Sequence, residues 1–274
     1  MTRPAVTPAE RFAERRAGSF SAERAVPEET PVALSYRGTT HAVMMATPAD
    51  LHDFALGFSL TEGVVSSLGE IEEIAIEEAG AGIDIQISLH ESAGDRFQAR
   101  RRRLAGPVGC GLCGIESIDE AMRSVASVDG GLKLSRSEVT EAVRLLSEHQ
   151  PMHRATGAVH AAGFFMPDRG IVAAREDVGR HNALDKLCGA LAREAVSGAS
   201  GAVVVTSRVS VEMVQKTAAI GASVLLAVSA PTALAIRTAD AANIALVALV
   251  RGEEFDVFTH PHRITDLEKA SHAA

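Results

Sequence analysis

The second half of the chain alternates short apolar runs with amphipathic segments, and this alternation restricts the possible folds more than any other feature. The runs "GAVVVTS", "ASVLLAVSA" and "IALVALVRG" are typical of buried strands, and the intervening "RVSVEMVQKTAAIG" and "PTALAIRTADAAN" place apolar residues at helical spacing. Strands that alternate with helices build a sheet with parallel strands and helices on its faces. We therefore predict an α/β domain over residues 134–266.

A smaller unit precedes this domain. "PVALSYRGTTHAVMMATP" contains two alternating runs around "RGTT", which indicates a hairpin, and "IEEIAIEE" and "IDIQISLH" alternate like half-buried strands. Between them, "TPADLHDFALGFSLTEG" predicts a helix with Thr47 as its cap and Pro48 in its first turn. The parts that we expect are a flexible tail, a small α+β domain, a linker with the cysteines, the α/β domain and a second tail, over residues 1–30, 31–104, 105–133, 134–266 and 267–274.

Charge and composition weigh against several classes of protein. The formal net charge is -8 at pH 7, which disfavours general nucleic-acid binding. No apolar run reaches the length of a membrane span, and the N-terminal segment lacks the apolar core of a signal peptide. Three cysteines are an odd number and make no disulfide framework in a chain of this size. These features predict a cytoplasmic protein with reduced thiols.

The turns that lead from strands into helices carry polar side chains. "EDVGRHN" and "TSRVS" each precede a predicted helix, and helix N-termini offer free backbone N–H groups and a partial positive charge. Ligands of such sheets bind at the carboxyl ends of the strands. These turns predict a phosphate-binding rim, although every α/β protein has similar turns, and the candidate contacts are Arg180, His181, Ser207 and Arg208.

The segment "PVGCGLCG" places Cys110 and Cys113 two residues apart. A structural zinc site needs four ligands, and the chain has no second CxxC; Cys188 lies in a predicted helix with apolar neighbours. In dithiol oxidoreductases the CxxC opens a helix after a strand, and no strong strand precedes it here. Glycines on both sides also argue against two inert core cysteines.

A carrier thiol on a mobile loop is a fourth interpretation of this segment. A cysteine that carries sulfur as a persulfide must meet a donor and then an acceptor, and an exposed flexible arm suits both encounters. The neighbouring run Arg100–Arg103 would stabilise a thiolate or persulfide anion, although a solvated charged segment explains such a run equally well. The residues alone leave a carrier thiol and a redox thiol as equal alternatives.

Five collinear motifs carry a more specific signal. The chain resembles the formate dehydrogenase accessory sulfurtransferase family (FdhD) from about Pro31 to Ile264, through the segments "LAGPVGCGLCGIESI", "TGAVHAAGFF", "REDVGRHNALDKLCG", "TSRVSVEMVQKTAAIGASVLLAVSAPTALAI" and "VFTHPHRI". The resemblance implies a sulfurtransferase required for formate dehydrogenase maturation. Such a protein takes persulfide sulfur from a cysteine desulfurase and passes it to the molybdenum cofactor, a bis(molybdopterin guanine dinucleotide), before the cofactor enters the apo formate dehydrogenase.

The same resemblance implies roles for individual residues. The persulfide cysteine corresponds to Cys110, and Cys113 corresponds to the second cysteine, whose role is uncertain. The family's cofactor-binding segment corresponds to Leu249, Val250, Arg251, Gly252, Glu253 and Glu254. The two glutamates are unfavourable beside phosphates, so this segment is a prediction of location more than of side-chain contacts. GDP or a related guanine nucleotide is expected to mimic the cofactor, and a homodimer is expected.

The second domain is also similar to the cytidine deaminase-like fold, which implies three layers around a mixed sheet. His160 matches a deaminase zinc ligand, but Ala162 stands where the catalytic glutamate would be, and no cysteine pair follows at the required spacing. Neither deaminase activity nor a structural metal is therefore expected. Two alternatives stay open: a chaperone that binds the cofactor without transferring sulfur, and a dithiol redox protein.

Overall fold

The structure of the 274-residue chain is a computed structural model, and it describes residues 3–16, 18–104 and 125–267. Within these ranges, the side chains of residues 12, 15 and 99–104 are left undescribed. Cys110, Cys113 and most of the predicted linker and C-terminal tail lie outside the described residues. The backbone of the arginine run Arg100–Arg103 is described as part of a helix.

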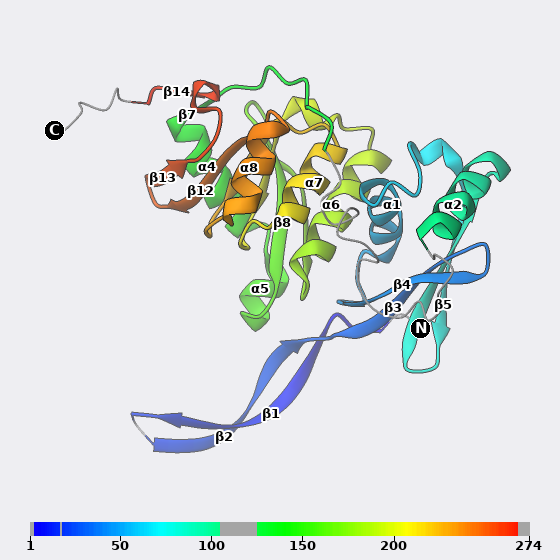
Figure 1. The fold of residues 1–274 in the computed structure, drawn as a ribbon. Helices are drawn as coiled ribbons and strands as arrows, with labels where there is room; N and C mark the ends of the chain where they lie inside the picture. Colours follow the sequence, from blue (N-terminus) through cyan, green and yellow to red (C-terminus); the bar gives the residue numbers. More distant parts are fainter. Residues whose placement is uncertain (1–2, 17, 105–124, 268–274) are drawn as a thin grey trace.

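A six-stranded mixed sheet forms the centre of the second half of the chain (Figure 1). The strand order is β13-β12-β11-β10-β8-β9; β10, β11 and β12 are parallel, and the outer pairings are antiparallel. The bounds are β8 His160–Met166, β9 Gly170–Asp177, β10 Ala202–Val205, β11 Val224–Ala227, β12 Ala245–Arg251 and β13 Glu254–Val257. The predicted α/β class is confirmed, whereas the closer likeness to a cytidine deaminase fold stays a prediction.

Helices cover both faces of this sheet and complete three layers. Val203 and Val205 of β10 pack in one apolar core with three helices, α6 Arg180–Arg193, α7 Val211–Ala219 and α8 Ala233–Ala241. Ala202 and Val204 face the opposite core, which contains α4 Arg136–Glu148. Neighbouring residues of the strand thus enter different cores, because successive side chains of a strand point to opposite faces.

The N-terminal half contains a second, four-stranded sheet in the order β4-β3-β6-β5. Its elements are β3 Thr30–Tyr36, β4 Thr39–Ala46, α1 Leu51–Thr61, β5 Ile71–Ala79, β6 Gly82–Leu89 and α2 Glu91–Leu104. Phe54 and Phe58 of α1 and Phe97 of α2 pack with the inward side chains of the strands in one core. The hairpin, the helix and the two later strands of the predicted α+β domain are confirmed as elements.

The start of α1 differs from the prediction. Asp50 occupies the N-cap with φ of 52°, and the helix begins at Leu51 rather than beside Thr47 and Pro48. Thr47 instead bonds to the second domain, because its N–H donates to Asp177 Oδ2 at 3.0 Å and its carbonyl accepts from Lys186 Nζ at 2.9 Å. A contact between domains therefore decides the local role of this threonine.

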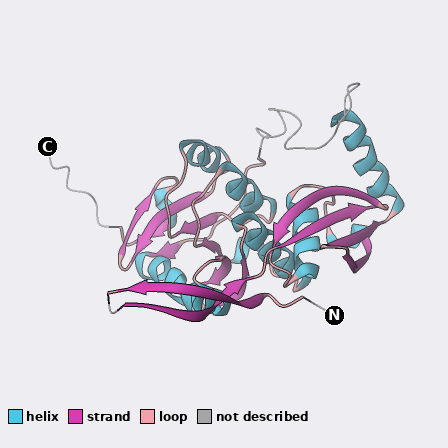
Figure 2. Cartoon of the chain, turned by 90° about the horizontal axis from the view of Figure 1, so that it is seen from below, coloured by secondary structure: helices cyan, strands magenta, loops and turns pink. Residues whose placement is uncertain are grey.

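The expectation of a flexible tail over residues 1–30 is wrong for Val6–Pro27. Strands β1 Val6–Arg15 and β2 Gly18–Pro27 pair over their whole length as a hairpin that extends away from the two sheets (Figures 1 and 2). Its base is fixed by a hydrogen bond from the Arg24 guanidinium to the Thr156 carbonyl at 2.8 Å. The strands mix charged residues with small ones, so they lack the apolar alternation that would have indicated them.

Several other elements were also not predicted. The helix α2 lies at the end of the predicted α+β domain, and α5 spans Pro151–Thr156. A two-residue parallel pair joins β7 Leu134–Ser135 to β14 Ile264–Thr265. Elements as short as α5, β7 and β14 show no periodicity. Among the helices of the described residues, none has both the length and the apolar character needed to cross a membrane.

Candidate functional site

One edge of the six-stranded sheet gathers most of the predicted site residues. The carboxyl ends of β10, β11 and β12 lie at this edge, and so does the end of β9, because β9 and β10 both run antiparallel to β8. We call it the carboxyl edge; it consists of the segments 178–181, 206–210, 229–232 and 249–254. The structure thus places Arg180, His181, Ser207, Arg208 and the predicted cofactor segment at the same edge.

The turn from β9 into α6 is held by Asp177. Its Oδ1 accepts from the Gly179 N–H at 2.7 Å and from the Asn182 side chain at 3.0 Å. These bonds close the chain tightly at the strand end, so that α6 begins at Arg180. Arg180 and His181 therefore occupy the first turn of a helix, as the sequence predicted, and a helix N-terminus favours negative charge.

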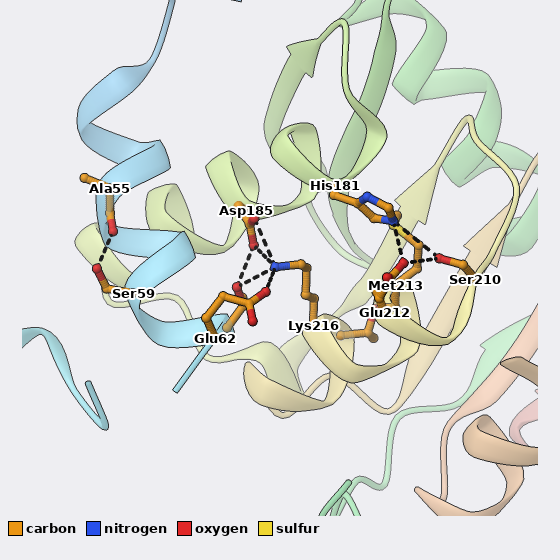
Figure 3. Close-up of polar contacts among 11 residues, drawn as sticks. Ala55, Ser59, Glu62, His181, Asp185, Ser210, Glu212, Met213 and Lys216 are labelled. Carbon is orange, nitrogen blue, oxygen red and sulfur yellow. Dashed lines mark hydrogen bonds and ion pairs between the residues drawn. The ribbon is translucent and has the colours of Figure 1, made fainter. Parts of the chain in front are cut away.

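His181 forms a polar cluster with the next turn of the edge (Figure 3). Its Nε2 lies 3.0 Å from Glu212 Oε2 and 3.4 Å from Ser210 Oγ, and the Ser210 hydroxyl donates to Glu212 Oε2 at 3.1 Å. Burial lowers the pKa of His181, and Arg180 and Lys216 lower it further, while Glu212 opposes them. The lowered pKa favours the neutral form of the imidazole.

A buried ion pair lies directly behind this cluster. Lys216 Nζ contacts Asp185 Oδ1 and Oδ2 at 2.8 and 3.0 Å, and it also donates to Glu62 Oε1 at 2.6 Å and Thr61 Oγ1 at 3.1 Å (Figure 3). Lys216 comes from α7, Asp185 from α6, and Thr61 and Glu62 from the end of α1. The pair therefore joins three helices of the two halves of the chain.

Most other charged residues of "REDVGRHNALDKLCG" also bond to the N-terminal half. Lys186 Nζ donates to the Thr47 carbonyl at 2.9 Å and to the fully buried Asp177 Oδ2 at 2.6 Å, and Arg175 contacts Asp53 at 2.6 Å. These contacts between the two halves were not predicted from the sequence. The available signal was the position of Asp185 and Lys186 between apolar residues of one helix, where an unpaired charge would be costly.

Arg180 is the best placed cation for a ligand at the carboxyl edge. Its Nε is buried, and it has no hydrogen-bond partner within the described residues. Arg208 is exposed, whereas Ser207 is buried and its hydroxyl donates to the Arg208 carbonyl at 3.0 Å. The two arginines are thus suited to contact an anion, and Ser207 is not.

The predicted cofactor segment forms the end of the β12–β13 hairpin. Leu249 and Gly252 have positive φ, 57° and 58°, and residues 251–254 are exposed. Arg136 of α4 donates to the Glu253 carbonyl at 3.2 Å. A cavity of about 320 Å³ opens beside this turn, lined by Arg136, Ser137, Thr140, Glu253 and Asp266. The cofactor contacts of the segment stay a prediction.

No group of three or more metal-binding side chains occurs among the residues that the structure describes. This finding does not extend to Cys110 and Cys113. The predicted core position of Cys188 is confirmed, because its side chain is fully buried and burial raises the pKa of its thiol. Cys188 is therefore an inert thiol and no substitute for the cysteines of the CxxC.

The fold defines an α/β protein with a four-stranded and a six-stranded sheet, and two arginines, Arg180 and Arg208, lie at the carboxyl edge of the larger one. The chain belongs to the FdhD/NarQ family, which it matches over residues 27–265, as the sequence motifs predicted. It is 57% identical to the sulfur carrier protein FdhD of Agrobacterium fabrum, over 93% of this chain and 94% of the relative. The corresponding protein of Cupriavidus necator is 52% identical, over 87% and 83%.

A solved structure shares the fold over nearly the whole chain. It is described as the crystal structure of a putative formate dehydrogenase accessory protein from Desulfotalea psychrophila. The TM-score is 0.76 at 26% identity, and the alignment covers 95% of this chain and all of the other. The likeness extends across both sheets, so the arrangement of the two halves is a property that this chain shares with that protein.

Proposed function

We propose that this protein is a cytoplasmic sulfur carrier for the maturation of formate dehydrogenase. The observation that carries the proposal is membership of the FdhD/NarQ family over residues 27–265, together with relatives that are named sulfur carrier proteins and share more than half of their residues with this chain. Its partners are a cysteine desulfurase, which donates sulfur, and the apo formate dehydrogenase that receives the finished cofactor.

Cys110 is the proposed carrier residue. Its thiolate attacks the terminal sulfur of the desulfurase persulfide; the donor S–S bond breaks and the donor cysteine leaves as a thiolate. Delivery breaks the new S–S bond at Cys110, which leaves as a thiolate, while the transferred sulfur takes two electrons from the acceptor. Cys113 is proposed to assist transfer or to protect Cys110 as a disulfide, because thiols at this spacing exchange readily.

The acceptor is proposed to be the molybdenum cofactor, as a bound substrate with two guanine nucleotide ends. The unpartnered Nε of Arg180 and the exposed Arg208 fit the phosphates of such a ligand, and both lie at the carboxyl edge where α6 and α7 begin. The segment Leu249–Glu254 lies at the same edge, although Glu253 and Glu254 would repel phosphates. The ligand would therefore contact this segment through its backbone.

The first test is mass spectrometry of the intact protein after incubation with a cysteine desulfurase and cysteine. We expect the wild type to gain the mass of one sulfur atom that a reductant removes, and Cys110→Ala to gain none. Cys188→Ala is the matched control and should load normally, because that thiol is buried. A wild type that stays unmodified beside an active desulfurase would contradict the carrier function.

Two outcomes would favour the alternative functions. A protein that binds GDP and activates formate dehydrogenase normally as Cys110→Ala would be a cofactor chaperone. A protein that needs Cys110 and Cys113 equally and has no affinity for GDP would be a dithiol redox protein. The expected homodimer is tested separately, by sedimentation velocity with and without GDP.

A further inference from the structure

The strand β4 forms an edge of the four-stranded sheet and carries no charged side chain. Edge strands of natural proteins commonly carry charges, which keep them from pairing with other chains. Among the described strands of more than two residues that lie at the edge of a sheet, only β4, with the sequence TTHAVMMA, has no Asp, Glu, Lys or Arg. The opposite edge of the same sheet, β5, contains Glu72, Glu73, Glu77 and Glu78. One edge of this sheet is therefore protected by charge and the other is not.

Two large apolar side chains are exposed on β4. Val43 is 59% exposed and Met45 is 49% exposed, and their spacing of two residues puts both on the same face of the sheet. Ala42 and Met44 point to the other face, where they pack against the apolar core of the N-terminal half. Exposed apolar side chains on an uncharged edge strand are typical of a strand that pairs with another chain.

The backbone of Val43 points away from its own sheet. Met45 lies opposite Pro31 of β3, which has no N–H, and the Met45 carbonyl accepts from the Asn182 side chain at 2.8 Å. Bonded and non-bonded positions alternate along an antiparallel pair, so Val43, two positions before Met45 in the same register, also directs its N–H and carbonyl outward. Neither group has a partner within the described residues, and both are available to a further strand.

A second copy of this chain fits this edge. The formal net charge of -8 makes two copies repel each other over most of their surfaces, so they approach best where charge is absent. Two antiparallel β4 strands related by a two-fold axis at Val43 would place Val43 opposite the partner's Val43, and Met44 opposite the partner's Ala42. These pairs are all apolar, and no like charges meet along the two strands.

We propose that β4 is the dimer interface of this protein and that it pairs with β4 of a second copy in an antiparallel, isologous arrangement. The two Val43 residues exchange both of their backbone hydrogen bonds at the axis, and the exposed Val43 and Met45 side chains of the two copies cover each other. The two four-stranded sheets then form one continuous sheet. A homodimer was expected from the family resemblance, and the structure adds the strand and the position of the axis.

Sedimentation velocity of the full chain over a range of protein concentrations tests the interface. We expect the wild type to be a dimer that dissociates on dilution. Val43→Lys places two lysines opposite each other at the axis and should raise the dissociation constant of the dimer at least roughly 100-fold. Ile76→Lys is the matched control: Ile76 is 43% exposed on β5, at the opposite edge, and this variant should dimerise like the wild type. Both variants replace exposed side chains and should keep the far-UV circular dichroism of the wild type.

A mixture of two variants tests the two-fold axis itself. Val43→Glu alone should be monomeric at concentrations where the wild type is dimeric, as Val43→Lys should be. An equimolar mixture of Val43→Lys and Val43→Glu places opposite charges at the axis and should restore a dimer with one copy of each. If β4 docked on any other part of the second copy, the two new charges would not meet, and mixing would restore nothing.

Three results would overturn the inference. The first is a wild type that stays monomeric at the highest concentration. The second is a dimer that Val43→Lys weakens no more than Ile76→Lys does, because its interface would then lie elsewhere. The third is a mixture of the two Val43 variants that stays monomeric. The inference concerns assembly and goes beyond sulfur transfer, so a wild type that dimerises but accepts no sulfur would contradict the carrier function alone.

Discussion

Gly57 of α1 and Gly189 of α6 face each other where the two halves of the chain meet. A Cβ on Gly57 would lie 1.7 Å from the Asp185 carbonyl oxygen and 2.7 Å from the Gly189 nitrogen, and a Cβ on Gly189 would lie 1.9 Å from the Asp53 carbonyl oxygen. The two helices therefore touch backbone to backbone. This close approach brings the ends of α1 within reach of the charged side chains of α6 and α7.

Replacing Gly57 with alanine should separate the helices. The added methyl group meets backbone atoms, which cannot rotate away, so we expect Gly57→Ala to lower the free energy of unfolding by about 3 kcal/mol, the upper end of the usual cost of overpacking. Urea unfolding followed by circular dichroism measures the loss. Gly69→Ala is the matched control: its Cβ would meet only Ser67 Oγ, at 3.8 Å, and stability should stay equal or rise slightly. Equal stability of both variants would contradict the backbone contact.

The buried Asp177–Lys186 pair should be far more important for stability than an exposed pair. Lys186→Met leaves a carboxylate buried without its cation, and we expect a loss of about 3–5 kcal/mol in the free energy of unfolding. Arg144→Met removes a cation from the exposed pair with Glu148 and should change stability by at most about 0.5 kcal/mol. Both values come from the same urea titration. If Lys186→Met and Arg144→Met both lose only a little stability, water must reach the Asp177 carboxylate.

Removing Lys216 should make stability fall as pH rises. Burial raises the pKa of Asp185, and Lys216 and Thr61 oppose this effect, so Lys216→Met should raise that pKa further. A carboxyl group whose pKa is higher in the folded protein than in the unfolded chain stabilises the fold at pH values below its unfolded-state pKa. This stabilisation is lost as the pH rises through the folded-state pKa. The deficit relative to wild type should therefore be larger at pH 8 than at pH 5.

The double variant Lys216→Met with Asp185→Asn is the control for this pH effect. Asparagine does not titrate, so the slope of stability with pH should return towards that of the wild type. Urea unfolding at several pH values gives both slopes. If the single and double variants show the same slope, another group is responsible.

Arg180 should contribute to the affinity for GDP. Loss of a charged hydrogen bond to phosphate weakens binding by about tenfold or more, so Arg180→Ala should raise the dissociation constant by that factor in calorimetric titrations. Arg208→Ala should weaken binding less, because an exposed arginine is better solvated. Arg169 lies in the turn between β8 and β9, at the opposite edge of the sheet, and Arg169→Ala should bind GDP like the wild type. Unchanged affinity in Arg180→Ala would place the nucleotide elsewhere.

The order of helices and strands was largely predictable because it depends on local patterns. The apolar runs that became β10, β11 and β12 and the helices between them follow from periodicity alone. The predicted cap of the helix at residues 136–148 is also local: Ser135 and Glu138 form a capping box. The hairpin Val6–Pro27 was missed because its strands lack an apolar face.

The site was predictable only in part. The strand-to-helix turns indicated Arg180, His181 and Arg208 before their positions were known, because these turns follow directly from the element order. Ser207 was also selected, but its hydroxyl is bound to the backbone. Glu212 was overlooked, since nothing near it in the sequence indicates a partner on another helix.

The sequence by itself determined the fold class, the two halves and the edge at which a ligand would meet the sheet. Tertiary structure alone decided which charged residues are free. Asp177, Asp185, Lys186 and Lys216 bond to residues of the N-terminal half or of another helix, whereas the Arg180 Nε has no partner within the described residues. The reason is physical: a periodic pattern shows which face of an element is buried, but the partner of a buried charge depends on how distant segments pack.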